Sequence, residues 1–296
     1  GELRHKLEKG GHPFRSKSDT ETILHAYEEK GVDAVHDFNG MFAIARWDEK
    51  KQQLFMARDR MGIKPFYYAL LKNGLFIFSS ELKAILAHPD FDREMDPCAI
   101  EDYFSYGYIP EPKTVFKHAS KLLPGHCLTL HRGQNMLQPR RYWDVPFKVN
   151  DSITIQEAQE ELIVLLRESV NIHLMTEVPL GAFLSGGVDS SAVVAMMSGL
   201  MNEPVNTCSI SFGDPAFNES RYAQEVADRY HTNHQVEQVE QDDFDLIDKL
   251  ALLYDEPFAD SSAMPTYRVC ELARKRVTVA LSGDGGDENF AGYRRY

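Results

Sequence analysis

Residues 178–191 carry an apolar run, a glycine pair and a second apolar run, and this order restricts the fold more than any other part of the chain. Residues 178–184 are typical of a buried strand, and residues 192–197 are typical of the first turns of a buried helix. Between them stands the motif Ser185-Gly186-Gly187-Val188-Asp189-Ser190-Ser191. A glycine turn from a strand into a helix offers backbone N–H groups to an anion. The motif therefore predicts a phosphate-binding loop, with an ordinary turn between two core elements as the alternative.

A second glycine loop follows another apolar strand. Residues 277–281 are apolar and β-branched, and they lead into Ser282-Gly283-Asp284-Gly285-Gly286-Asp287-Glu288. Ligands of open parallel α/β sheets gather beyond the carboxyl ends of the strands, so we expect both loops at one edge. Carboxylates this close repel one another without a cation. This loop favours a metal and nucleotide site over a solvated turn.

The pattern of the chain changes near residue 150. Short aromatic strands with turns fill residues 1–145, and they predict an α+β domain with antiparallel sheet. From there on, strands alternate with helices, which predicts an α/β doubly wound, largely parallel sheet. The expected strands of this second part are 178–184, 204–212, 234–239 and 277–282, and the expected helices are 152–176, 190–200, 218–230, 242–254 and 262–275. Residues 139–149 are the expected linker.

These motifs resemble those of the glutamine-dependent asparagine synthetase family. The first loop is similar to the pyrophosphate loop of the ATP pyrophosphatases, and residues 281–293 are similar to the family's second signature. Three further stretches, 38–43, 58–65 and 78–83, resemble its class II glutaminase domain. The resemblance implies an incomplete Ntn-hydrolase-like glutaminase domain at 1–145 and an incomplete synthetase domain of the adenine nucleotide alpha hydrolase-like kind at 146–296. The sequence thus resembles a fragment that lacks both ends.

The resemblance implies an ATP-dependent carbon–nitrogen ligase with glutamine as amide donor. ATP would adenylate a carboxylate, aspartate in asparagine biosynthesis, and ammonia would then displace AMP. The implied nucleotide contacts are Leu184, Ser185, Gly186, Gly187, Asp189, Ser190, Ser191, Ile210, Ser282 and Gly283, although Ile210 is equally explained as a core residue. Asp189 and Asp287 are the implied Mg²⁺ ligands, and Asp284 is the implied catalytic residue.

Two positions leave alternatives open. Asparagine-forming members of the family usually carry Glu where this chain has Asp284. The loop with the shorter Asp resembles that of amidotransferases of surface polysaccharide biosynthesis, which use other acceptors. Asp260 is explained equally well as a neighbour of a helix N-cap and as part of the acceptor pocket. A module that binds ATP without catalysis remains the competing class of function.

The glutaminase half lacks the residues that class II chemistry needs. The family uses an N-terminal cysteine whose own α-amino group serves as base, and this chain begins with Gly1. The resemblance implies that Asp19 binds the α-ammonium group of glutamine. Alternatively, Asp19 is a helix cap. Residues 1–145 are therefore expected to be inactive as a glutaminase.

Composition limits the partners and the compartment. A net charge of −13 disfavours nucleic acid and anionic membranes. No apolar run approaches the ~20 residues of a membrane span, and the scattered cysteines predict no disulfide framework. His5, His12 and His25 are scattered as well, so Mg²⁺ is the only metal expected. We expect a cytoplasmic protein that acts on small molecules, with a homodimer as the candidate assembly.

Overall fold

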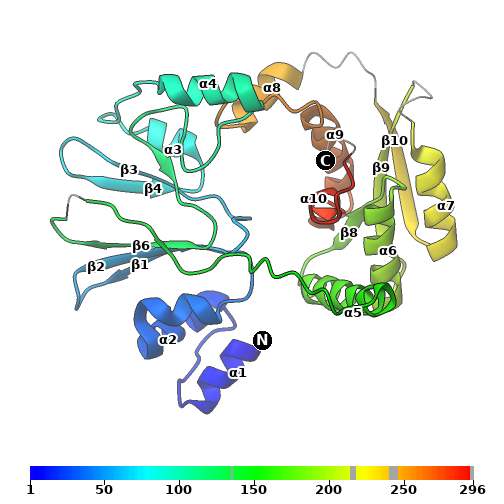
Figure 1. Cartoon of the computed structure of the whole chain (residues 1–296), viewed down its shortest axis with the longest axis horizontal. Helices are drawn as coiled ribbons and strands as arrows, with labels where there is room; N and C mark the ends of the chain where they lie inside the picture. The colour runs from blue at the N-terminus through cyan, green and yellow to red at the C-terminus, as the bar shows by residue number, and fades with distance from the viewer. Residues whose placement is uncertain (135, 214–217, 240–245, 294–296) are drawn as a thin grey trace. The chain divides into compact units, whose positions relative to one another are not determined.

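The computed structural model describes residues 1–134, 136–213, 218–239 and 246–293, and it divides the chain into two compact units (Figure 1). Unit 1 comprises Gly1–Lys148 and Ala251–Ala259, and unit 2 comprises Val149–Leu250 and Asp260–Tyr296. Unit 1 therefore takes in a short segment from the second half of the sequence. The division into functional domains at residue 145 stays a prediction, because the units reflect packing alone.

Unit 1 contains two antiparallel sheets, as the alternation of short aromatic strands predicted. The first sheet has the order β1-β2-β6-β7, with bounds Ala43–Asp48, Gln53–Arg58, His126–His131 and Arg140–Arg141. The second has the order β4-β3-β5, with bounds Phe76–Ser79, Tyr67–Leu70 and Ser120–Lys121. The helices are α1 (Glu2–Lys9), α2 (Asp19–Lys30), the 3-10 helix η1 (Gly31–Asp37), α3 (Leu82–Leu86) and α4 (Pro97–Tyr106).

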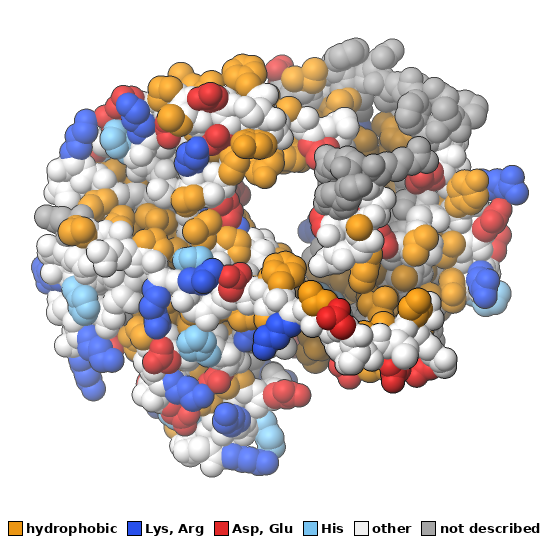
Figure 2. All heavy atoms as spheres, in the orientation of Figure 1, with side chains coloured by type: hydrophobic (Ala, Val, Ile, Leu, Met, Phe, Trp, Pro, Cys, Tyr) orange, Lys and Arg blue, Asp and Glu red, His pale blue; other side chains and the backbone are white. Residues whose placement is uncertain are grey.

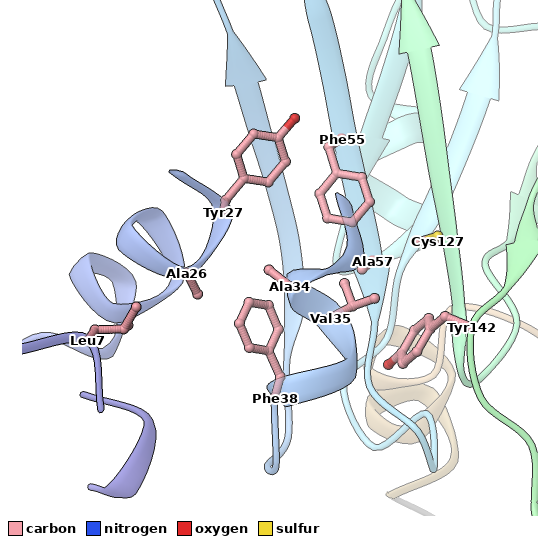
Figure 3. Packing of buried hydrophobic residues seen from close by; sticks show 10 residues of the cluster. All are labelled: Leu7, Ala26, Tyr27, Ala34, Val35, Phe38, Phe55, Ala57, Cys127 and Tyr142. Carbon is pink, nitrogen blue, oxygen red and sulfur yellow. The ribbon is translucent and has the colours of Figure 1, made fainter. Parts of the chain in front are cut away.

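The core of unit 1 forms where the N-terminal helices meet the first sheet. Figure 3 shows Leu7 of α1 and Ala26 of α2 on one side, and Phe55 and Ala57 of β2 on the other. Val35 of η1 lies among them and is completely buried. Burying the larger of these side chains, those of Leu7, Val35 and Phe55, contributes roughly 1.5–3 kcal/mol each. This cluster fixes α2 against the sheet.

The loop after β2 is held by two buried charged side chains. Asp59 is 1% exposed, and its carboxylate accepts the N–H groups of Ile63 at 3.0 Å and Lys64 at 2.9 Å. The Arg58 guanidinium donates to the carbonyl oxygens of Gly62 and Lys64 and pairs with Glu111 at 2.7 Å. These hydrogen bonds hold the turn formed by residues 58–65, which carry part of the glutaminase resemblance.

Unit 2 is built on a four-stranded parallel sheet, which confirms the predicted α/β part. The strand order is β10-β9-β8-β11, with bounds Asn233–Val239, Asn206–Phe212, Leu180–Phe183 and Val279–Leu281. The helices are α5 (Ile155–His173), α6 (Val188–Leu200), α7 (Ser220–Tyr230), α9 (Ala263–Arg274) and α10 (Gly286–Phe290). A further helix, α8 (Leu246–Leu253), leads into the segment that belongs to unit 1.

Helices cover both faces of this sheet (Figure 1). Leu180 and Ala182 of β8 pack with residues of α6 and α7 in one cluster. Phe183, which points to the opposite face, packs with Leu272 and Ala273 of α9. This alternation is what a doubly wound sheet requires, because successive side chains of a strand point to opposite faces.

Charged side chains are distributed without a basic patch on the face that Figure 2 shows. On this face of the described residues, Lys and Arg side chains lie scattered among Asp and Glu side chains. No helix in the described part of the chain combines the length and apolar character that a membrane span requires. All four cysteines are free thiols, and Cys127 and Cys208 are buried. The absence of nucleic-acid and membrane partners stays a prediction, as does the homodimer.

Candidate functional site

The two glycine loops leave neighbouring strands at the same edge of the unit 2 sheet. β8 and β11 pair in parallel, with Leu281 opposite Ala182, and each loop follows the carboxyl end of its strand. The strand order reverses here, because β9 and β10 extend the sheet on one side of β8 and β11 lies on the other. Open α/β sheets bind their ligands at such a reversal. The expected common edge of the two loops is therefore confirmed.

The first loop is braced by two serine hydroxyls. Ser190 is 7% exposed, and its Oγ lies 2.9 Å from Ser185 Oγ and accepts the Ser185 N–H at 3.2 Å. Ser185 Oγ in turn accepts the Gly187 N–H at 3.2 Å. α6 then begins at Val188 and runs for 13 residues. The free N–H groups at the start of such a helix, together with its dipole, favour an anion.

The second loop packs directly onto the first. A Cβ at Gly283 would lie 2.6 Å from the Ser190 backbone nitrogen, which is closer than real contacts allow. A Cβ at Gly286 would overlap the Asp189 carboxylate. The two glycines therefore permit a close approach that brings Asp189 against the backbone of the second loop. This approach explains why the second loop is rich in glycine.

A cavity of about 800 Å³ lies between the loops. Ten predicted site residues line it: Leu184, Ser185, Gly187, Asp189, Ser190, Ile210, Ser282, Gly283, Asp284 and Asp287. Its apolar wall includes Phe183, Phe212, Val269 and Phe290. Small-molecule sites commonly have volumes of about 300–1,000 Å³ and combine apolar walls with a few polar groups. The cavity has the size and the mixed lining that a nucleotide needs.

Two predicted contacts lie outside this lining. Gly186 packs against α7, where an added Cβ would lie 2.5 Å from the Ala223 nitrogen. The Ser191 hydroxyl is buried and has no hydrogen-bond partner among the described residues. Direct contact of Gly186 and Ser191 with a ligand stays a prediction that this arrangement does not favour.

Negative charge dominates the cavity. Asp189, Asp284, Asp287 and Glu219 contribute to the lining, whereas no described Lys or Arg does. The Ser282 hydroxyl donates to Asp284 Oδ2 at 2.9 Å and so fixes that carboxylate. Mg²⁺ is usually held by one or two carboxylates together with substrate phosphates. Asp189 and Asp287 fit this mode, because each lies on a different loop of the same cavity.

Sequence reasoning missed the part of the lining that comes from α7 and α9. Glu219 and Ser220 stand at the start of α7, and Pro265, Thr266 and Val269 belong to α9. The start of α7 was accessible to prediction, because a helix that follows β9 begins at the carboxyl edge of the sheet. No comparable sequence signal marked the residues of α9.

Asp260 accepts the Ser262 N–H at 2.8 Å just before α9, and it is not among the residues that line the cavity. Ser262 is the N-cap of α9, so this hydrogen bond supports the interpretation of Asp260 as a neighbour of the helix cap.

Asp19 lies in unit 1, at the first residue of α2. Ser18 is the cap of this helix, since its hydroxyl accepts the Thr20 N–H at 3.2 Å. The Asp19 side chain is exposed. The alternative that Asp19 caps α2 is therefore wrong, because Ser18 fills that place.

Two family models match the chain. Residues 161–296 match asparagine synthase, and residues 1–143 match a glutamine amidotransferase domain. The chain is 43% identical over 283 residues to putative asparagine synthetase (glutamine-hydrolyzing) 2 of Methanocaldococcus jannaschii, which covers 93% of this chain and 54% of the relative. It is 35% identical over 300 residues to asparagine synthetase (glutamine-hydrolyzing) 1 of Bacillus subtilis, with coverages of 100% and 46%. The chain spans about half the length of the curated relatives it matches.

Proposed function

We propose a function on the premise that this chain belongs to the glutamine-dependent asparagine synthetase family. The cavity of unit 2 binds ATP with Mg²⁺, and the whole protein amidates a carboxylate with ammonia taken from glutamine. Aspartate is the acceptor, and asparagine is the product. The observation that carries this proposal is the meeting of the loops of Asp189 and Asp287 around one cavity whose described lining has no basic side chain.

The phosphates of ATP are assigned to the first loop and to the start of α6. The loop carries two serine hydroxyls at the cavity wall, Ser185 and Ser190, and the dipole of α6 attracts negative charge. Adenine is assigned to the apolar wall near Leu184 and Ile210. Asp189 and Asp287 would hold Mg²⁺, which supplies charge neutralisation on the pyrophosphate that leaves.

The reaction consists of two displacements. A carboxylate oxygen of the acceptor attacks the α-phosphorus of ATP and pyrophosphate departs, and the nitrogen of ammonia then attacks the acyl carbon and AMP departs. The apolar wall lowers the amount of water that competes with ammonia. Asp284, fixed by Ser282, is assigned to the first of these steps.

A second candidate is a related amidotransferase with another acceptor, in surface polysaccharide biosynthesis. Asp284 favours it, because its side chain is one methylene shorter than Glu and is hydrogen-bonded back to its own loop. A change in reach at this position alters which acceptor carboxylate is oriented correctly.

Binding of Mg²⁺-ATP to this chain tests the proposal, measured by titration calorimetry. We expect Asp189→Asn to weaken binding at least tenfold and to remove its dependence on Mg²⁺. Asp228→Asn is the matched control, since Asp228 lies on α7 outside the lining and accepts from Gln224. Equal affinity of Asp189→Asn and Asp228→Asn would refute the nucleotide site.

The acceptor is tested with the whole protein. Pyrophosphate release from Mg²⁺-ATP and ammonia that requires aspartate supports the asparagine synthetase. Release that requires a different carboxylate supports the second candidate. ATP binding without pyrophosphate release in the presence of any acceptor supports a module that binds ATP without catalysis.

We further assign residues 1–145 to a glutaminase domain of the Ntn-hydrolase type, with Asp19 as the partner of the glutamine α-ammonium. The exposed carboxylate at the start of α2 supports this role, because Ser18 already caps the helix. In the whole protein, Asp19→Asn should raise KM for glutamine and leave the ammonia-dependent reaction unchanged. Loss of both reactions would instead indicate a structural role.

A further inference from the structure

Two histidines and a glutamate of unit 1 point toward a common centre. His12 lies in the segment between α1 and α2, whereas His25 and Glu28 lie one turn apart on α2. The two Nδ1 atoms are 3.2 Å apart, and Glu28 Oε2 lies 2.8 Å from His25 Nδ1 and 3.6 Å from His12 Nδ1. The ring centroids are 4.8 Å apart, which is farther than the nitrogens, so both rings turn their Nδ1 edges toward each other.

The hydrogen bonds around this centre leave lone pairs without partners. His12 Nε2 lies 3.1 Å from Glu29 Oε1, a contact that places the His12 proton on Nε2 and leaves Nδ1 as a lone pair. His25 Nε2 is buried and has no hydrogen-bond partner among the described residues, and the Glu21 carboxylate is 3.9 Å away. A neutral His25 ring carries one proton. If this proton is on Nδ1, it faces two acceptors, His12 Nδ1 and Glu28 Oε2, and the buried Nε2 is left without a hydrogen bond.

A metal ion satisfies all three atoms at once. The three distances define a circle with a radius of about 1.9 Å, so an ion slightly above its plane lies about 2.0–2.1 Å from each ligand. These are the lengths of zinc bonds to histidine nitrogen and carboxylate oxygen. We propose that His12, His25 and Glu28 bind Zn²⁺, with a fourth position open to water.

The surroundings suit such an ion. The side chains of His12 and His25 are 19% and 15% exposed, so most of the water that would compete is excluded. Glu29 takes the place of the carboxylate that usually receives the second ring N–H of a metal-bound histidine. An ion here fastens residues 10–18 to α2, immediately before Asp19. His12 and His25 are 13 positions apart in the sequence, and this distance hid their proximity from sequence reasoning.

A second group in unit 1 provides a contrast. Asp92, Glu94 and His118 also lie close together. There, however, Lys72 pairs with Asp92 at 2.7 Å and Lys117 pairs with Glu94, so lysines already neutralise the carboxylates. No comparable lysine contact to Glu28 is present in the described chain. His118→Gln is therefore the matched control for the loss of one histidine.

The test is Zn²⁺ binding to the metal-free chain, purified without a polyhistidine tag. Calorimetry should give one tight site, and Co²⁺ in its place should give the visible absorption bands of a tetrahedral ion. We expect His12→Gln and His25→Gln to lower the affinity at least 100-fold, and Glu28→Gln and Glu29→Gln to lower it about 10–100-fold. His118→Gln should bind as the parent chain does.

Three results would overturn the proposal. The first is an absence of stoichiometric binding to the parent chain. The second is binding that His12→Gln, His25→Gln and Glu28→Gln leave unchanged, because the ion would then lie elsewhere. The third is an equal loss in His118→Gln. Glu28→Gln keeps the test decisive even where a histidine variant fails to fold, because the Glu28 side chain is 55% exposed.

Discussion

Glu256 forms a buried ion pair whose loss should lower the stability of unit 1. It reaches this unit within the segment Ala251–Ala259. Its Oε2 lies 2.5 Å from Lys121 Nζ, and its Oε1 accepts the Val115 N–H at 2.7 Å. Lys121 also donates to the Ile109 carbonyl at 3.0 Å. Both charged side chains are only 11% exposed, so little water screens the pair.

We expect Glu256→Gln to lower the free energy of unfolding of unit 1 by about 3 kcal/mol. The amide oxygen of glutamine can still accept from Val115, so the main change is that Lys121 stays buried without its counter-ion. Breaking a buried pair costs about 3–5 kcal/mol, whereas exposed pairs contribute about 0–1 kcal/mol. Lys121→Met together with Glu256→Gln should cost less than the sum of the two single changes, because the isolated charge is gone.

Urea unfolding followed by tryptophan fluorescence measures this quantity for unit 1 alone. Both tryptophans of the chain, Trp47 and Trp143, belong to unit 1. Lys72→Gln is the control, because Lys72 pairs with Asp92 while its side chain is 81% exposed. A loss in Glu256→Gln no larger than in this control, or simple additivity in the double variant, would refute the argument.

Three further outcomes follow from individual contacts. Gly286→Ala should abolish nucleotide binding and cost unit 2 about 1–3 kcal/mol, since its Cβ overlaps Asp189; an unchanged calorimetric titration would contradict this. Hydrogen bonds from the Ser16 side chain and from the Arg15 N–H lower the pKa of Glu21 to about 2 from 4.5. The protection of the Arg15 amide against exchange, measured relative to the unfolded chain, should therefore fall as pH drops from about 4.5 to 2, and Glu21→Gln should remove this dependence. Burial lowers the pKa of His234, so the folded state binds its proton less readily and stability falls as pH drops below 6.5; an NMR titration that gives a pKa above 6.5 would contradict this.

The parallel sheet and its two loops could be predicted because their signals are local. Each buried strand is followed at once by a glycine loop, and the alternation of strands with helices restricts the topology. The common edge of the two loops follows from the rule that such sheets gather ligands beyond the carboxyl ends of their strands. The direct pairing of β8 with β11, which about 100 residues separate, needed coordinates. Ser190 and Asp284 were predicted as site residues from their positions in the two loops. Their hydrogen bonds with Ser185 and Ser282 could be seen only in the structure.

Other parts of the fold could not be predicted from the sequence. α4 has a local signal, with Asp96 as cap, Pro97 at its start and Gly107 at its end, yet the surrounding aromatic strands concealed it. The inclusion of residues 251–259 in unit 1 depends on Glu256 and Asp255, whose partners lie more than 130 positions earlier. A pairing over such a distance leaves no periodicity in the sequence. His12 and His25 are only 13 positions apart, but His12 lies before α2, so helical periodicity does not connect the two residues.

The passage of residues 251–259 through unit 1 makes this unit discontinuous in the sequence. The chain crosses between the units at 148–149, again at 250–251 and a third time at 259–260. A chain cut at the first crossing would therefore separate residues 1–148 from Glu256, which pairs with Lys121 and accepts the Val115 N–H. Exchange of either half with that of a relative should therefore carry residues 251–259 and Lys121 together, because the ion pair of Glu256 joins them.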